Sequence, residues 1–264
     1  VGGEAPGHLL DRALILVQLE LAGGMIDDGV HDSLPACSSP PRQSKASAAL
    51  RNATIRKEAV HASAMDLHRR LLTATRAYLA GIEAPMLASF IDGADWSMEE
   101  RALSAGPLPC LHHLDRISSI AEEGREIIGF LAGNRNAFHW GQTYSEADFG
   151  PDFIENYGWM ELFGTRGHFA NERMAGGFLI LGPHLHYPDH HHFAEEIYIP
   201  LTGGTAWRRG DGVYLEKPAG AVIHHPSNVS HAMKTGAEPL LALYLWRGGP
   251  LAERSTVTGR AAQA

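Results

Sequence analysis

Histidines gather in one part of this chain at spacings that suit metal binding. Of the 264 residues 16 are histidine, and eight of these lie between positions 184 and 231. Alternate side chains of a strand share a face, so His190 and His192 point the same way and Glu196 shares their parity. A further ligand should come from elsewhere in the fold, and His231 follows a predicted tight turn. The predicted metal ligands are therefore His190, His192, Glu196 and His231.

Imidazole nitrogens and a carboxylate together suit a divalent transition metal. Zn is our first expectation, and Fe, Mn, Co and Ni accept the same donor atoms. A solvated His-rich loop is the competing interpretation, but the spacing, the parity and the distant histidine together favour a metal site. The remaining histidines of this part are expected to be hydrogen-bond donors to the ligands or pocket walls; they include His184, His186, His224 and His225.

Composition argues against several other classes of function. The chain carries 22 Lys and Arg against 30 Asp and Glu, a formal net charge of −8, and has no basic cluster. Nucleic acid is therefore not expected as a partner, because phosphate binding needs concentrated positive charge. With only Cys37 and Cys110, a disulfide framework or an all-thiolate zinc site is excluded.

No membrane segment is expected either. The most apolar N-terminal stretch, residues 13–21, is too short and too polar to span a bilayer. We expect a soluble, cytoplasmic protein, with the periplasm as the alternative. Because the chain does not begin with Met, the sequence does not exclude an upstream targeting segment.

The elements that must position the histidines differ between the two halves of the chain. Residues 1–135 carry apolar side chains at spacings of three and four, which is typical of helices. The expected helices span 8–21, 48–79, 84–91 and 114–131. A stretch rich in Pro and Ser over 32–47 is expected to form a linker.

After Gly133, short runs of aromatic and β-branched residues alternate with turn residues. The expected strands span 177–182, 196–201, 212–216 and 240–246. Many short strands at this spacing predict an antiparallel sandwich or barrel. We therefore expect a mainly β fold with a helical N-terminal region at 1–135, a β-barrel with the metal site at 136–250 and a C-terminal tail at 251–264.

The ligands fall within a two-part pattern that resembles the cupin signature. Its parts are Gly182-x7-His190-x-His192-x3-Glu196-x6-Gly203 and Gly220-x5-Pro226-x-Asn228-x2-His231. Two features within these parts depart from the usual pattern: seven residues instead of five precede the first histidine, and Asn228 replaces Gly. Asn tolerates the left-handed turn conformation better than most residues. The closing Asn is replaced by Thr235, which concerns a structural position. The resemblance implies a C-terminal cupin barrel, a double-stranded β-helix or jelly roll.

Tyrosines and tryptophans around this pattern make the resemblance more specific. The segment from Tyr187 to Tyr198 and the segment from His231 to Pro239 are similar to cupin-type dimethylsulfoniopropionate lyases, which release dimethyl sulfide and acrylate. The similarity extends from about Trp140 to Gly249. It implies that His190, His192, Glu196 and His231 hold the metal, that Tyr198 is the general base, and that Tyr187 and Trp246 line the substrate pocket.

The implied reaction is a β-elimination from a sulfonium propionate. A metal that binds the substrate carboxylate stabilises the charge that develops there as the α-proton leaves. The same cation lowers the pKa of Tyr198 from the ordinary phenol value of about 10. An aromatic face can attract the sulfonium by roughly 0.5–2 kcal/mol. Tyr187 is the second candidate catalytic residue, and the predicted substrate-binding residues are Trp246, Trp207, Tyr244 and His186.

Two other functions would use the same ligands. One is a different metal-dependent cupin enzyme, an Fe(II) dioxygenase or an isomerase, and the other is a non-catalytic cupin that binds a small anion. The expected partner is a small sulfonium carboxylate, without nucleic acid or membrane, and a homodimer is compatible with the fold. We also expect the segment near Trp140 to Tyr144 to close the pocket mouth.

Overall fold

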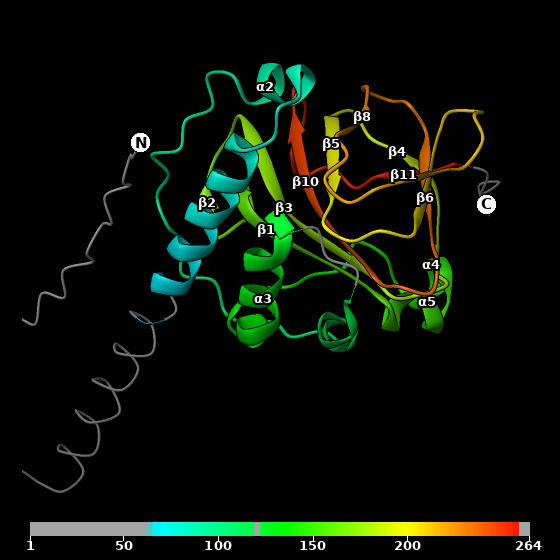
Figure 1. Cartoon of the computed structure of the whole chain (residues 1–264), viewed down its shortest axis with the longest axis horizontal. Helices are drawn as coiled ribbons and strands as arrows, with labels where there is room; N and C mark the ends of the chain where they lie inside the picture. Colours follow the sequence, from blue (N-terminus) through cyan, green and yellow to red (C-terminus); the bar gives the residue numbers. More distant parts are fainter. Residues whose placement is uncertain (1–62, 64, 119–121, 259–264) are drawn as a thin grey trace, which may run out of the picture. The chain divides into compact units, whose positions relative to one another are not determined.

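The N-terminal part of the described chain is helical. The computed structural model describes residues 63, 65–118 and 122–258, and residues 65–80 form a helix. The elements that follow, with η for a 3-10 helix, are α2 (Pro85–Ile91), η1 (Pro109–Arg116), η2 (Glu122–Gly124), α3 (Arg125–Asn134) and η3 (Arg135–Ala137) (Figure 1). Within these residues, every helix is too short or too polar to span a bilayer. The helix expected over 8–21 and the linker expected over 32–47 lie outside the described residues.

The helix expected over 114–131 is interrupted. η1 ends where the backbone of Ile117 becomes extended, and α3 begins only at Arg125. The hydroxyl of Ser118 donates to Oε1 of Glu238 at 2.6 Å, and serine is unfavourable in helix interiors because its side chain competes for backbone partners. The expectation of one continuous helix was therefore wrong.

The rest of the described chain is mostly β-strand, after two short helices. The helices are α4 (Glu146–Phe149), which begins with a capping box between Ser145 and Asp148, and α5 (Pro151–Glu155). The strands are β1 (Tyr157–Gly164), β2 (Phe169–Ala170), β3 (Met174–Leu181), β4 (His186–His191), β5 (Glu195–Pro200), β6 (Thr205–Arg209), β7 (Leu215–Lys217), β8 (Ile223–His225), β9 (His231–Thr235), β10 (Leu240–Arg247) and β11 (Thr256–Val257).

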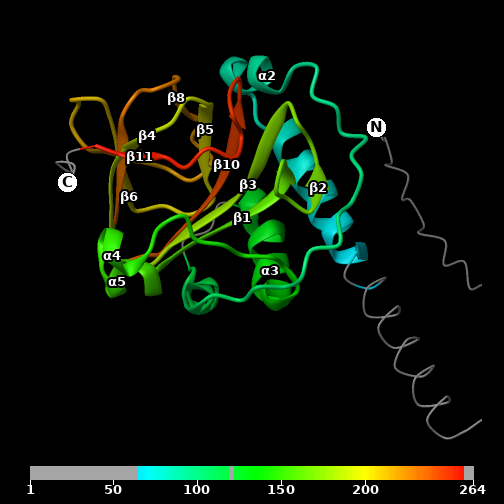
Figure 2. The same cartoon turned by 180° about the vertical axis from the view of Figure 1, so that it is seen from behind.

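These strands form two sheets that face each other (Figures 1 and 2). The six-stranded sheet has the order β2-β1-β3-β10-β5-β8, and the five-stranded sheet has the order β11-β4-β9-β6-β7. From β3 onward, the chain passes to the other sheet at nearly every connection. This path is that of a jelly roll. The fold class expected from the sequence, a cupin barrel after a helical N-terminal region, is confirmed.

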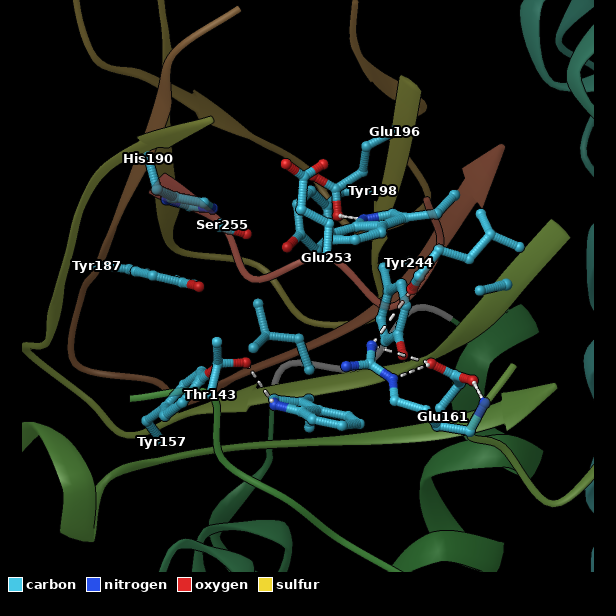
Figure 3. Close-up of a pocket in the computed structure, with 16 residues that line it drawn as sticks. Thr143, Tyr157, Glu161, Tyr187, His190, Glu196, Tyr198, Tyr244, Glu253 and Ser255 are labelled. Carbon is cyan, nitrogen blue, oxygen red and sulfur yellow. Dashed lines mark hydrogen bonds and ion pairs between the residues drawn. The ribbon is translucent and has the colours of Figure 1, made fainter. Parts of the chain in front are cut away.

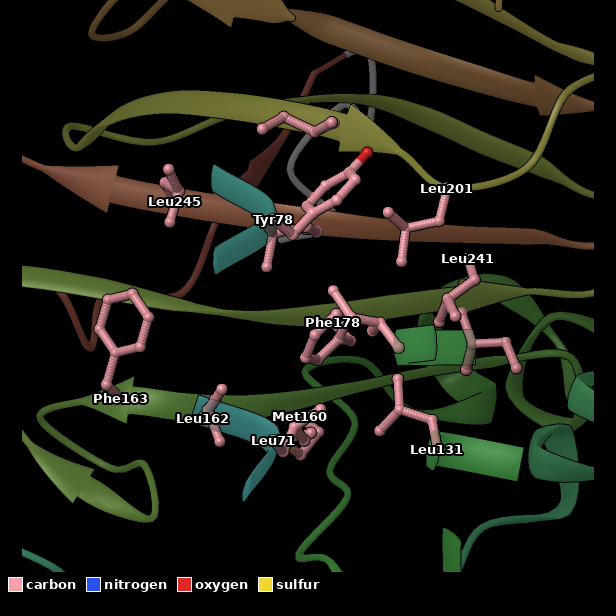
Figure 4. Close-up of a cluster of buried hydrophobic side chains, with 14 of the residues drawn as sticks. Leu71, Tyr78, Leu131, Met160, Leu162, Phe163, Phe178, Leu201, Leu241 and Leu245 are labelled. Carbon is pink, nitrogen blue, oxygen red and sulfur yellow. The ribbon is translucent and has the colours of Figure 1, made fainter. Parts of the chain in front are cut away.

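The six-stranded sheet is buried on both faces. On β10, Leu241 and Leu243 belong to a core cluster that also contains Leu71 of the N-terminal helix (Figure 4). The alternate side chains Ala242 and Tyr244 belong to a second cluster, which joins residues of both sheets. Because successive side chains of a strand point to opposite faces, one strand serves both clusters. The helices thus cover the outer face of this sheet, and its inner face is free to form a site with the other sheet.

Candidate metal centre and active site

The predicted metal ligands come from both sheets. His190 lies on β4 and pairs in register with His231 on β9. β4 ends at His191, so His192 lies where the chain crosses to the other sheet, and Glu196 lies on β5. The expectation that one strand carries the first three ligands was wrong. His192 and Glu196 nevertheless converge with His231 because the two sheets face each other.

The three histidines share one feature that suits metal ligation. Each has Nδ1 within hydrogen-bond distance of a backbone carbonyl oxygen two residues away, at 2.9 Å for His190, 2.8 Å for His192 and 3.0 Å for His231. A carbonyl oxygen can only accept, so Nδ1 carries the hydrogen. In the neutral ring Nε2 then has none and presents a lone pair, as metal-binding histidines do.

Three acceptor atoms of His192, Glu196 and His231 face one another, and we call these three residues the metal group. Oε2 of Glu196 lies 3.1 Å from Nε2 of His192 and 3.1 Å from Nε2 of His231. All three side chains are buried, and their ligand atoms lie within 4.8 Å of one another. Neutral imidazole nitrogens and a carboxylate oxygen repel at such distances unless a proton or a metal ion lies among them. The residues therefore fit a divalent transition metal.

The charges of the group also favour a cation. Burial raises the pKa of Glu196, but His192 and His231 outweigh burial and hold that pKa well below its ordinary value. Burial lowers the pKa of His192, but the attraction of Glu196 outweighs it and the pKa is raised. Burial and the nearby His231 lower the pKa of His190 well below its ordinary value. The carboxylate is thus ionised in a buried site, and a positive charge next to it, a proton on His192 or a metal ion, offsets the cost of burying it.

Two further histidines border this group. The ring centroid of His190 lies 4.2 Å from that of His231 and 6.4 Å from that of His192. His225, on β8, stacks on His231 with centroids 4.1 Å apart. Its side chain is buried, and neither ring nitrogen has a hydrogen-bond partner among the described residues. His190 is therefore adjacent to the convergent ligands, and His225 forms part of the wall around them.

A pocket opens beside the metal group (Figure 3). The predicted residues that line it are His190, Glu196, Tyr187, Tyr198, Tyr244 and Trp246. Thr143, from the segment expected at the pocket mouth, also lines it. The other lining residues were not predicted from the sequence; they are Tyr157, Trp159, Glu161, Arg166, Ala175, Leu179, Leu251, Glu253 and Ser255. Much of the wall is aromatic, and aromatic faces attract cations as well as apolar groups.

Tyr198 lies on β5, two residues after Glu196, and is almost fully buried. Alternation along the strand directs both side chains to the inner face. Burial raises the pKa of Tyr198 well above 10, and the charge of Glu196 raises it further. Without a bound cation, the phenol therefore stays protonated.

Trp246 and Tyr187 each contact predicted metal ligands. Nε1 of Trp246 donates to Oε1 of Glu196 at 2.6 Å, and its indole stacks on His192 with centroids 4.0 Å apart. The ring of Tyr187 stacks on His190 at 4.2 Å with an interplanar angle of 9°. Both aromatic residues thus contact the pocket and a predicted ligand at the same time.

Trp207 and His186 lie outside this pocket. The indole of Trp207, on β6, packs against the ring of Tyr198 with centroids 5.2 Å apart. His186 is exposed, and its Nε2 lies 3.0 Å from the hydroxyl of Tyr214. Their role in substrate binding stays a prediction.

Glu161 and Arg166 form another part of the pocket wall, and Glu161 lies across the pocket from His190 in Figure 3. The buried carboxylate of Glu161 accepts hydrogen bonds from the backbone N–H of Arg166 at 2.6 Å and from its guanidinium at 3.2 and 3.3 Å. A β-bulge in β1 lies directly after Glu161 and changes the direction of the strand there. A single Glu in an apolar run belongs to no motif, so the spacing of residues does not predict this pair.

The segment from Trp140 to Tyr144 reaches the pocket only at its end. Thr143 lines the pocket, whereas Trp140 belongs to the core cluster on the helical side. Tyr144 is buried and accepts a hydrogen bond from the hydroxyl of Tyr187 at 3.3 Å. Closure of the pocket mouth by this segment stays a prediction.

The chain is similar in sequence to two proteins whose names give the same activity, one of them as putative. Dimethylsulfoniopropionate lyase DddQ of Ruegeria pomeroyi is 35% identical over 119 residues, which cover 45% of this chain and 59% of that protein. Putative dimethylsulfoniopropionate lyase DddL of Cereibacter sphaeroides is 29% identical over 144 residues, which cover 53% of this chain and 60% of that protein. The matches thus span about three fifths of the length of these relatives.

Solved structures agree with this similarity. A structure from work on the dimethylsulfoniopropionate lyases RdDddP and RnDddQII has a TM-score of 0.69 and 28% identity, covering 74% of this chain and 99% of that chain. The structure of DddQ from Ruegeria pomeroyi has a TM-score of 0.66 and 27% identity, covering 73% and 96%. The family model for dimethylsulfoniopropionate lyase matches residues 86–242, more than half of the 264 residues. The chain therefore belongs to the dimethylsulfoniopropionate lyase family.

Proposed function

We propose that this protein is a metal-dependent carbon–sulfur lyase that cleaves dimethylsulfoniopropionate to dimethyl sulfide and acrylate. The observation that carries the proposal is the buried group of His192, Glu196 and His231, which adjoins Tyr198 at an aromatic pocket. Membership of the family supports the reaction class.

His192, Glu196 and His231 would hold the metal, with His190 as a fourth donor. Zn is the first candidate, and Fe, Mn, Co and Ni suit the same nitrogen and oxygen donors. When bound, the metal would supply a Lewis acid for the substrate carboxylate and so favour loss of the neighbouring α-proton.

Tyr198 is the proposed general base. Burial and Glu196 hold its pKa well above 10 in the protein alone, so the base must depend on the positive charge of the loaded site. As a phenolate, Tyr198 takes the α-proton of the substrate. The electron pair left behind forms the carbon–carbon double bond, and the carbon–sulfur bond breaks with its electrons on sulfur. Dimethyl sulfide and acrylate are then the products.

We propose that Tyr187 holds His190 in position and does not accept the α-proton. Burial raises the pKa of its phenol well above 10, and its hydroxyl donates to Tyr144. Its stacking on His190 fixes the plane of that ring. We propose that Trp246 and Tyr244, which line the pocket, supply aromatic faces for the sulfonium.

Headspace detection of dimethyl sulfide tests this function. Metal-loaded wild type should release the gas from dimethylsulfoniopropionate without O₂, and His231→Ala should lose activity together with metal. Tyr198→Phe should lower kcat roughly 10²- to 10⁴-fold while keeping the metal, because it removes only the base. Tyr78→Phe, on a buried tyrosine of the helical core cluster outside the pocket, is the matched control.

The results also separate the two other candidate functions. Absence of gas from wild type loaded in turn with Zn, Fe, Mn, Co and Ni would refute the lyase. Uptake of O₂ would then indicate a dioxygenase, whereas binding without turnover would indicate a small-anion receptor. Full activity of Tyr198→Phe would leave the reaction standing and remove the proposed base.

A further inference from the structure

Residues 250–258, here called the C-terminal strap, are held against the barrel at both ends. Leu251 is buried, and its carbonyl oxygen accepts a hydrogen bond from Arg166 at 3.4 Å. At the other end β11 pairs with β4, and the backbone N–H of Thr258 donates to the carbonyl of Asp189 at 2.7 Å. The sequence predicts only a tail here. The structure makes the strap part of the pocket.

The strap places one carboxylate in the pocket wall. Glu253 lines the pocket together with Glu196 and Trp246, and Figure 3 labels it among the residues of the pocket wall. Its Oε2 accepts a hydrogen bond at 3.2 Å from the backbone N–H of Phe193, the residue after His192. The carboxylate is therefore oriented by the loop that carries a predicted metal ligand.

Glu253 differs from the other two carboxylates of the pocket wall. Glu161 is paired with Arg166, and Glu196 is paired with the histidines of the metal group. In the described part of the chain, no Lys, Arg or His side chain lies within ion-pair distance of Glu253; its hydrogen bond comes from a neutral backbone amide. The pocket thus carries one negative charge that a ligand can neutralise.

The proposed substrate has its two charges at opposite ends. Its carboxylate would be drawn to the metal group, and its sulfonium must then lie a few bonds away, near a site that is itself positive once loaded. A carboxylate in the wall offsets this repulsion. The sulfonium charge disappears as the carbon–sulfur bond breaks, so an ion pair to sulfur stabilises the bound substrate at least as much as the transition state.

We propose that Glu253 is the residue that selects for a positively charged β-substituent on the substrate. The inference rests on the proposed function and deepens it. The strap contributes to recognition of the onium group, whereas the barrel carries out proton removal. Glu253 therefore determines KM and the preference for cationic substrates, and contributes little to kcat.

Steady-state kinetics of Glu253→Gln tests the split between KM and kcat. Glutamine keeps an oxygen for the Phe193 amide and removes only the charge. KM for dimethylsulfoniopropionate should rise about fivefold, the upper end for an exposed ion pair, with kcat within twofold of wild type. Glu216→Gln, an exposed position on β7 outside the pocket, removes the same charge and should change neither constant. Unchanged KM, or a loss confined to kcat, would overturn the inference.

A binding measurement keeps this inference separate from the proposed function. Metal-loaded protein is titrated calorimetrically with 3-(trimethylammonio)propionate and with 4,4-dimethylpentanoate, an isostere that keeps the carboxylate and lacks the positive charge. Wild type should prefer the cationic acid, and Glu253→Gln should reduce that preference about fivefold. Equal preference in both proteins would overturn the role of Glu253. Because neither ligand needs to react, this result stands even if wild type releases no dimethyl sulfide.

Discussion

Replacing Trp246 by Phe should weaken metal binding, although Trp246 is not a ligand. Its Nε1 donates to Oε1 of Glu196 at 2.6 Å while its ring stacks on His192 at 4.0 Å. Phenylalanine retains an aromatic ring for the stacking but leaves a buried carboxylate oxygen without its donor. Hydrogen bonds to charged groups contribute about 1.5–3 kcal/mol, and loss of an outer partner of a ligand typically costs about 10- to 100-fold in metal affinity.

Competition with a chromogenic chelator for Zn measures this effect directly. The Kd of Trp246→Phe should be about 10- to 100-fold above that of wild type. Two other tryptophans provide controls: Nε1 of Trp159 donates to the neutral hydroxyl of Thr143 at 3.0 Å, and Nε1 of Trp207 has no partner among the described residues. Neither Trp159→Phe nor Trp207→Phe should change Kd. Equal weakening in all three variants, or none in Trp246→Phe, would refute the reasoning.

Two predictions concern stability. Burial, followed by the nearby His68, lowers the pKa of His168 from 6.5 to about 3. Because the unfolded chain takes up this proton below pH 6.5, stability should fall from pH 6.5 towards pH 3, by about 1.4 kcal/mol per pH unit, and urea denaturation of His168→Gln should lack that component of the slope. The Thr235 hydroxyl donates to the carbonyl of Gly182 at 2.7 Å and accepts from the N–H of Leu185 at 2.8 Å. Thr235→Val should therefore lower the free energy of unfolding in urea by about 1–3 kcal/mol, and a variant as stable as wild type would contradict this.

Features that depend on short-range spacing, such as the turn at Asn228 and the role of Thr235, can be predicted from the sequence. The turn between β8 and β9 needs a residue that tolerates a left-handed backbone, and Asn228 has φ of 59° there. Its N–H donates to the carbonyl of His192 at 2.9 Å, so the turn also supports the loop of a predicted ligand. Thr235 bonds backbone groups alone, as expected for a structural position. Local patterns of this kind can be recognised in the sequence because the backbone geometry they need is specific.

The rest of the pocket depends on contacts between distant parts of the chain. Glu161 faces the pocket next to a bulge in β1, and Arg166 returns to it from the following loop. Glu253 reaches the pocket only because the strap pairs with β4. Trp207 has the inward orientation that alternation predicts, yet Tyr198 separates it from the substrate pocket. Periodicity shows which face a side chain takes, but the position along that face is set by register between strands.

The residues of the site come from both sheets. The six-stranded sheet, buried on both faces, supplies Glu196 and Tyr198, whereas the five-stranded sheet supplies His190 and His231. A bound metal would therefore join the sheets, and part of its binding free energy would stabilise the folded barrel. Tyr198 lies on the same strand as Glu196, so their spacing is set by a rigid element. Glu253, which we propose recognises the onium group, lies on a separate strap, where sequence change can alter the preferred substituent without moving the proposed base.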